Sequence, residues 1–328
     1  MFPLYSSSNR TISQMNISKL KINISILIVY YDNQSLMQHC LDSIVRYAPE
    51  FTEIIIINNS PSACSFKYSH RLNYKLVDYR TNYGFGKANN IGLSYAQGEY
   101  LLLLNPDTEI TDEFIGKSIE LIEKYPAIAA VGPKLIDDRN IVQNSAFKFP
   151  TLKNYLLHDI LFIKDNDINT KNNKYQDLSD GTLKCDWLCG AAIMFRREIF
   201  EKVKGFDTRY FLYYEDVDLF NKIHDAGYDV AYCPSYIVKH YDKDESGIYS
   251  NKFNNAQRIV AHDFSMMQYW HKHKPEMMPI VRFLVFVRSL SRLVIWGFSP
   301  SLKAHAGTNC VNERIRGYLN SILMSVIK

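Results

Sequence analysis

Apolar runs alternate with segments of helical spacing over the first 131 residues of the chain. The runs predict strands at residues 22–29, 53–57, 75–78, 100–104 and 128–131. Helices are predicted where apolar residues recur every three or four positions, at 34–48, 91–97 and 112–125. Because the strands are apolar at consecutive positions, both of their faces are expected to be buried. The pattern therefore predicts an α/β fold in which helices cover both faces of a parallel sheet.

The pattern changes at residue 151. Residues 151–181 are polar and rich in Asn and Asp, which predicts a mobile insertion or loop. Beyond them, strands are predicted at 185–195, 229–233 and 236–240, and helices at 197–203 and 214–227. The remainder, 255–328, is expected to be helical. We therefore expect an N-terminal extension (1–21), an α/β domain (22–250) and a helical C-terminal region (251–328).

Within the C-terminal region, residues 279–298 are strongly apolar but contain Arg282, Arg288 and Arg292. On a helix these arginines fall within about a third of the helical circle. Three arginines make a membrane-spanning helix costly. Two interpretations stay open. The helix lies in the membrane interface with its arginines toward lipid headgroups, or it is an amphipathic helix packed on the protein's own core.

Composition and charge exclude several classes of protein. Of 328 residues, 47% are hydrophobic and 22% are charged, which is typical of a globular protein. The net charge of +4 is too small to indicate a nucleic-acid partner. Six sparse cysteines exclude a small disulfide scaffold, and no zinc-binding spacing is present, so free thiols are expected. Residues 1–21 lack the apolar segment of a signal peptide, which favours a cytoplasmic location.

Polar side chains follow three of the predicted strands. In an open α/β sheet, ligands bind beyond the carboxyl ends of the strands. Asp107 is the most informative of these residues, because a carboxylate placed there is able to hold a hard cation against a diphosphate. A turn or helix cap is the alternative role for an isolated Asp. The strand-end residues are Tyr31, Asp32 and Asn33, Asn58 and Asn59, and the segment 105–109.

The segment NYGFGKANN (82–90) predicts a loop that wraps backbone N–H groups around an anion, with Lys87 nearby. It is not a P-loop, and Asn89 stands where a dinucleotide-binding loop has its third glycine. Further along, aromatic residues surround Glu215 and Asp216 at a predicted helix start. Acidic residues there are stabilised by the helix dipole, but a carboxylate in an aromatic cleft also suits a general base. His240 ends a predicted strand and is a candidate third metal ligand.

Five motifs in order give the chain a clear resemblance over about residues 22–245. They are SILIVYYDN, IIIINNS, NYGFGKANNIG, LLLLNPDTE and GAAIMFRREIFEKVKGFDTRYFLYYEDVDL. Together they resemble the family 2 glycosyltransferases, in the subgroup that includes bacterial rhamnosyltransferases. The resemblance implies a GT-A-type nucleotide-sugar-binding fold, with a mixed, mostly parallel central sheet and here a helical C-terminal extension.

Site roles follow from this resemblance. Asp216 is expected to be the catalytic base, with Glu215 beside it. A divalent metal, Mg²⁺ or Mn²⁺, is expected on Asp107, with Glu109 and His240 completing its ligands. Asn105 replaces the first Asp of a full D-x-D motif, which implies weaker metal affinity. Donor contacts are assigned to Tyr31, Asn58, Asn82, Gly84, Lys87, Asn90, Asn105 and Asp107.

The activity implied is inverting transfer of a sugar, with dTDP-L-rhamnose the best donor and UDP-hexoses open. The acceptor implied is a hydroxyl of a lipid-linked saccharide in bacterial O-antigen or capsule synthesis. Such a protein would be peripheral at the inner face of the cell membrane, with residues 279–298 as the contact. Two alternatives stay open: a catalytically silent nucleotide-sugar-binding component of a polysaccharide assembly complex, and a sugar-nucleotide nucleotidyltransferase.

Overall fold

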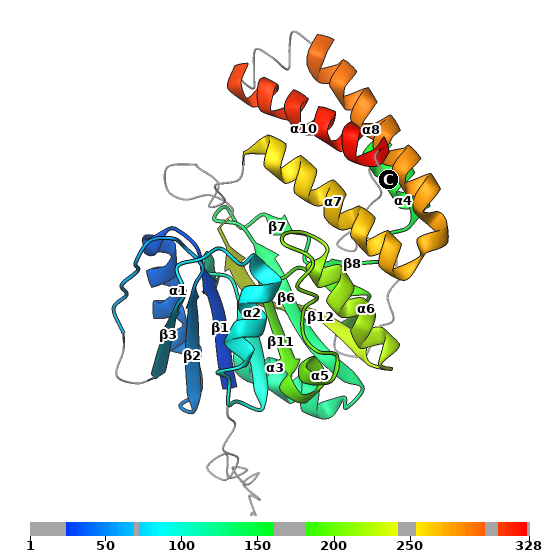
Figure 1. The fold of residues 1–328 in the computed structure, drawn as a ribbon. Coiled ribbons are helices and arrows are strands. Elements are labelled where there is room, and N and C mark those ends of the chain that lie inside the picture. The colour runs from blue at the N-terminus through cyan, green and yellow to red at the C-terminus, as the bar shows by residue number, and fades with distance from the viewer. Residues whose placement is uncertain (1–23, 69–71, 161–180, 242–253, 299–307, 327–328) are drawn as a thin grey trace, which may run out of the picture.

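The structure is a computed structural model that describes residues 24–68, 72–160, 181–241, 254–298 and 308–326. An α/β domain lies below three long C-terminal helices, of which α7 (Asn255–His273) is nearest the domain (Figure 1). The predicted extension 1–21 lies outside the described residues, as does most of the predicted insertion. The start of that insertion, 152–160, is helical: α4 (Leu152–Tyr155) runs into a π-helical turn (Leu156–Ile160).

A mixed sheet forms the centre of the domain. Its main path runs β3-β2-β1-β4-β11-β6-β12-β5. Strands β1 to β4 pair in parallel, β11 is antiparallel to both of its neighbours, and β12 is parallel to β6. The predicted mostly parallel α/β sheet is therefore confirmed. The strands on the path are β1 (Ile24–Tyr30), β2 (Thr52–Asn58), β3 (Asn73–Asp78), β4 (Tyr100–Leu104), β5 (Thr108–Ile110), β6 (Ile128–Ile136), β11 (Ala192–Arg196) and β12 (Asp229–His240).

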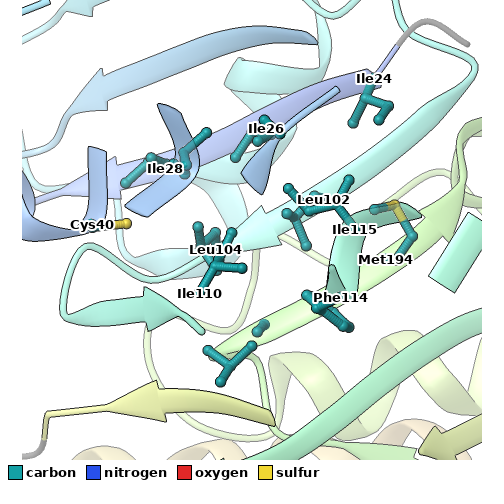
Figure 2. Packing of buried hydrophobic residues seen from close by; sticks show 14 of the residues in the cluster. Ile24, Ile26, Ile28, Cys40, Leu102, Leu104, Ile110, Phe114, Ile115 and Met194 are labelled. Carbon is teal, nitrogen blue, oxygen red and sulfur yellow. The ribbon is translucent and has the colours of Figure 1, made fainter. Parts of the chain in front are cut away.

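Two buried layers cover the sheet, one on each face. Strand β1 shows why, because alternate residues of this wholly buried strand belong to different layers. Ile24, Ile26 and Ile28 pack with α1 (Gln34–Tyr47) and α3 (Phe114–Lys124), as Figure 2 shows for part of this cluster. The opposite face packs on α2 (Phe85–Leu93), α5 (Arg197–Lys202) and α6 (Glu215–Asp225).

Several predicted elements differ from the structure in their bounds or number. Helix α2 begins at Phe85 rather than at residue 91, because Gly84 adopts a left-handed φ of 77° and starts the helix inside the predicted loop. The predicted strand 185–195 is three short strands: β9 (Leu183–Cys185), β10 (Trp187–Leu188) and β11. The two strands predicted within 229–240 are one strand with a register shift between Cys233 and Ile237. Short strands β7 (Val142–Gln143) and β8 (Ala146–Phe147) complete the sheets.

The C-terminal region is helical, as predicted. After a 3₁₀ turn (Pro275–Met277), α8 (Met278–Phe298) and α10 (Thr308–Val326) pack against each other and against α7. Val281 and Val285 of α8 join a cluster with Met266 and Trp270 of α7. This side of α8 fits the interpretation of a helix packed on the protein's own core. No helix among the described residues has the length and hydropathy needed to cross a membrane.

The expectation that the α8 arginines face lipid headgroups is wrong for Arg288. Its guanidinium is buried and donates to the carboxylate of Asp263 on α7, which has no exposed surface. A buried arginine is tolerated only with a well-placed anion, and this pair supplies one. The ion pair therefore fixes α8 with its arginine side toward α7.

We expect Asp263→Ala to lower the free energy of unfolding by ~3–5 kcal/mol, because Arg288 would stay buried without its anion. Replacing both residues, Asp263→Leu with Arg288→Met, should cost much less than the single change. Urea unfolding of the full chain, followed by circular dichroism, measures both. Glu113→Ala, which breaks an exposed ion pair with Lys117, is the control and should cost less than ~1 kcal/mol. An equal loss in the single and double variants would contradict the role of the pair.

Candidate functional site

A cavity of about 310 Å³ lies beyond the carboxyl ends of β1, β2 and β4. Its wall combines these strand ends with the loop before α2, the segment before β11 and the segment before α6. Residues from positions 29 to 216 thus meet in one place, which is where α/β sheets bind ligands. The lining includes Tyr31, Asp32, Asn33, Asn59, Asn82, Gly84, Asn105, Asp107, Gly190, Phe211, Tyr213, Glu215 and Asp216.

Two asparagines shape the wall beside β2. The Asn59 amide donates to Asn82 Oδ1 at 3.1 Å, and Asn59 Oδ1 accepts from the Tyr83 backbone N–H at 2.8 Å. Asn82 Oδ1 also accepts from the Gly84 N–H at 3.0 Å. This network holds the loop against β2. Asn58, the predicted donor contact, is fully buried and gives its amide to Ser62 and Asp78 instead of lining the cavity.

Gly84 is needed where it stands. Besides its positive φ, an added Cβ would lie 2.3 Å from the backbone oxygen of Phe211. The loop therefore touches the segment that leads to α6. Asn90 makes a second link, because its amide donates to Phe206 O at 2.8 Å and its oxygen accepts from Phe206 N–H at 2.9 Å. Lys87 is exposed and lies over the Tyr83 ring at 4.5 Å. Neither Asn90 nor Lys87 lines the cavity.

Asp107 and His240 meet at the cavity wall. Asp107 follows β4 and is only 9% exposed, and its Oδ1 lies 3.6 Å from His240 Nε2. Pairing of β5 with β12 brings His240 there, opposite Thr108. The other ring nitrogen, Nδ1, is held by Gln143 Oε1 at 2.9 Å, which orients the imidazole. One carboxylate and one imidazole suit a divalent cation that takes its other ligands from phosphate and water.

Glu109 does not join this pair. Its carboxylate accepts from the Tyr241 hydroxyl and lies 3.8 Å from Lys239 Nζ. Among the residues that the structure describes, no three His, Cys, Asp or Glu side chains are placed to hold a metal together. The predicted three-residue metal set is thus not assembled by the protein alone. Asp107 and His240 fit a divalent ion, and Glu109 is occupied elsewhere.

Glu215 and Asp216 open helix α6 at the other side of the cavity. The two residues before them, Tyr213 and Tyr214, both have left-handed backbones, with φ of 68° and 65°. Successive left-handed tyrosines are costly and persist only where the surrounding structure imposes them. They turn the chain sharply, so that both carboxylates start the helix at the cavity.

Burial controls the protonation of this pair. It raises the pKa of Glu215 to about 8, with the charge of Asp216 adding to the effect. Burial also raises the pKa of Asp216 to about 6, although hydrogen bonds from the backbone N–H groups of Val217 and Gly190 act to lower it. No described group pairs with Glu215 Oε2. The arrangement favours a neutral Glu215 beside an ionisable Asp216, which suits general-base chemistry near neutral pH.

An ion cluster anchors α6 from behind. Asp218 has no exposed surface and lies 2.7 Å from both Lys272 Nζ and His273 Nε2 of α7. Although burial opposes it, hydrogen bonds from His273 and Lys272 hold the pKa of Asp218 below its usual range. Lys272 also lies 2.8 Å from Asp207. The helix that carries Glu215 and Asp216 is therefore tied to the C-terminal region.

A second cavity of about 250 Å³ meets the first at α6. The two share Tyr213, Glu215 and Asp216. Trp187, which stacks on Phe147 at 4.1 Å, forms an aromatic wall of the second cavity. Its other lining residues are Lys148, Pro150, Tyr214, Val217 and His262. The carboxylate pair thus borders two binding spaces.

Seven of the predicted site residues line the first cavity, and the remaining five lie outside that lining. The first group is Tyr31, Asn82, Gly84, Asn105, Asp107, Glu215 and Asp216. The second is Asn58, Lys87, Asn90, Glu109 and His240. No individual role was expected for the lining residues Asn59, Gly190, Phe211 and Tyr213. Each had a signal in the sequence: Asn59 follows a predicted strand directly, Phe211 and Tyr213 belong to the aromatic residues around Glu215 and Asp216, and Gly190 begins the fifth motif.

Known proteins resemble this chain in sequence and in fold. The chain is 28% identical over 241 residues to rhamnosyltransferase WbbL of Escherichia coli, which covers 70% of this chain and 88% of that protein. It is 28% identical over 218 residues to N-acetylglucosaminyl-diphospho-decaprenol L-rhamnosyltransferase of Mycobacterium tuberculosis. That alignment covers 62% of this chain and 68% of the relative. The structure of a mannosyltransferase from Pyrobaculum calidifontis, solved with GDP-Man and Mn²⁺, aligns with a TM-score of 0.50 at 14% identity. The alignment covers 92% of this chain and 86% of the mannosyltransferase.

Family models agree with these relatives. The model for the N-terminal domain of galactosyltransferase matches residues 176–244, which include Glu215 and Asp216. The model of glycosyl transferase family 2 matches residues 25–204, more than half of the chain, and the fold is that of GT-A glycosyltransferases. The resemblance noted from the motifs is confirmed: the chain belongs to glycosyl transferase family 2.

Proposed function

We propose that this glycosyltransferase moves a sugar from a nucleotide-sugar donor to a hydroxyl of a lipid-linked saccharide, with inversion. The observation that carries the proposal is the placement of Glu215 and Asp216 between two cavities. The larger cavity suits the donor, because it also contains Asp107 and the loop around Gly84. The smaller, aromatic-walled cavity suits the acceptor saccharide, since sugar faces stack on aromatic rings.

The choice of donor and pathway follows from the relatives. Both named relatives are rhamnosyltransferases, so dTDP-L-rhamnose is the donor that we propose. The name of the second relative contains a decaprenol diphosphate, which supports a polyprenyl-linked acceptor. Such acceptors serve the assembly of cell-surface polysaccharides such as O-antigen or capsule. A peripheral position at the inner face of the cell membrane follows from that acceptor.

The chemistry assigned to Asp216 is proton removal. Its carboxylate takes the proton of the acceptor hydroxyl as that oxygen bonds to the anomeric carbon of the donor. The bond from that carbon to the diphosphate breaks on the opposite face, so the configuration inverts in one displacement. Glu215, kept neutral by burial, is placed to donate a hydrogen bond to the acceptor without competing for its proton.

Asp107 and His240 are the residues that we propose hold Mg²⁺ or Mn²⁺. When bound, such an ion supplies positive charge to the leaving diphosphate. Tyr31, Asn59 and Asn82 line the same cavity and position the donor. Backbone N–H groups near Gly84 and the side chain of Asn105 complete the proposed donor contacts.

Replacing Asp216 tests the base. We expect Asp216→Asn to lower kcat by a factor of ~10²–10⁴, because an amide does not accept the hydroxyl proton. Transfer is measured by mass spectrometry with dTDP-L-rhamnose and polyprenyl-diphospho-N-acetylglucosamine. Asp225→Asn, at the exposed end of the same helix, is the matched control. Activity of Asp216→Asn near that of the control would remove Asp216 as the base.

Replacing Asp107 tests the metal role. In the presence of Mn²⁺, we expect Asp107→Ala to bind dTDP at least ~10-fold more weakly, a loss of about 1.4 kcal/mol. Binding is read as the shift in melting temperature caused by nucleotide with and without Mn²⁺. Asp138→Ala, an exposed acid on the turn after β6, is the control. An unchanged dependence on Mn²⁺ in Asp107→Ala would refute the role.

The raised pKa of Glu215 predicts a pH-dependent stability difference. Burial disfavours ionised Glu215, so its contribution to stability is present below pH 4.5 and is lost as pH rises toward 8. Glutamine never ionises. The stability of Glu215→Gln relative to the wild type should therefore increase between these values, by up to about 5 kcal/mol, since each pKa unit corresponds to about 1.4 kcal/mol. Thermal melts at several pH values measure it, and a difference independent of pH would contradict the burial argument.

A further inference from the structure

Helix α8 has an apolar side that faces away from the protein. Five of its residues are 46–83% exposed: Ile280, Phe283, Leu290, Val294 and Phe298. At 100° per residue they fall within about 80° of the helical circle. The buried residues Val281, Val285, Arg288 and Ser289 lie on the opposite side. The exposed side is therefore a continuous apolar stripe along the helix.

Helix α10 has an exposed apolar side of its own. Leu319, Leu323 and Val326 are 49–66% exposed and share one side of its C-terminal half. The two helices lie side by side beyond α7, as Figure 1 shows. Exposed apolar side chains gathered in this way mark a contact surface, whereas single ones are ordinary. We refer to these eight residues of α8 and α10 as the outer apolar surface.

The charge of the surrounding helices identifies the partner. The described C-terminal residues, 254–298 and 308–326, contain eight Lys and Arg against three Asp and Glu. Two of these cations already lie against anions, Lys272 against Asp207 and Asp218 and Arg288 against Asp263. The other six cations still outnumber the two remaining acidic residues of these ranges, Glu276 and Glu313. Helix α8 itself has no acidic residue. An anionic lipid surface satisfies both features, since it accepts apolar side chains below its headgroups and attracts cations at them.

A second copy of the chain satisfies only one of the two features. A symmetric dimer through the outer apolar surface would bury the apolar residues but would bring two positively charged regions together. A membrane-spanning role is also inconsistent, because no described helix is long and apolar enough. The structure thus favours a helix pair that lies on a bilayer.

We propose that the outer apolar surface binds the face of an anionic lipid bilayer, with α8 lying along it. This combines the two interpretations that the sequence left open, because Arg288 and the buried side of α8 pack on α7 while the opposite, apolar side faces lipid. This membrane contact rests on the proposed function for its biological role, because a lipid-linked acceptor would be reached at a membrane surface. Its physical basis, the exposed stripe and the charge, is independent of sugar transfer.

Vesicle flotation of the full chain tests the proposal. Wild-type protein should bind vesicles of phosphatidylethanolamine and phosphatidylglycerol, and should bind phosphatidylcholine vesicles less. The triple variant Phe283→Gln, Leu290→Gln, Val294→Gln should bind at least ~10-fold more weakly, because three inserted apolar side chains are lost. The control, Phe51→Gln, Ile141→Gln, Val142→Gln, changes three residues of similar exposure elsewhere and should bind as the wild type does.

The remaining outcomes overturn the proposal. Wild-type protein that ignores anionic vesicles refutes it, as does equal binding by both triple variants. Leu319→Gln with Leu323→Gln on α10 gives an independent second variant, and circular dichroism verifies folding. Self-association of the wild type that the α8 variant abolishes, with no vesicle binding, would assign the surface to a second copy. Because flotation uses neither donor nor acceptor, failure of sugar transfer leaves its result unaffected.

Discussion

The placement of buried Glu215 beside half-buried Asp216 at the start of α6 is the constraint that organises this protein. Glu215 and Asp216 border two cavities in a region where ionisation is costly. The fold holds them there through a sharp left-handed turn at Tyr213 and Tyr214. Further along the same helix, fully buried Asp218 is held by two side chains of α7, Lys272 and His273. The C-terminal region is therefore a structural support of the site as well as an appendage to the domain.

The strand ends were the predictable part of the site. Consecutive apolar residues located β1, β2 and β4, and the rule that ligands bind beyond their carboxyl ends placed Tyr31, Asn105 and Asp107 correctly at one cavity. Loop residues were less predictable, because their roles depend on partners far along the chain. Asn90 contacts residue 206, and Glu109 contacts residue 241. Sequence spacing alone contains no information on such partners.

The side of α8 that faces the protein was likewise not predictable from the helix alone. A helical pattern shows which side chains share a side, and it placed Arg282, Arg288 and Arg292 together. It does not show which side faces the protein, because that depends on Asp263, 25 residues away on another helix. The bounds of β12 and α2 also depend on features that the hydrophobic pattern does not show. The register shift in β12 is set by its neighbour β6, and the early start of α2 is set by the left-handed backbone of Gly84.

The close approach of Gly84 to Phe211 joins two walls of the larger cavity. The loop that borders the larger cavity lies against the backbone of the segment that leads into the carboxylate pair, and Asn90 is hydrogen-bonded to residue 206. A movement of either segment requires the other to move. If filling one cavity shifts its segment, it would also change the free energy of filling the other, and thermodynamic reciprocity would make this influence equal in both directions.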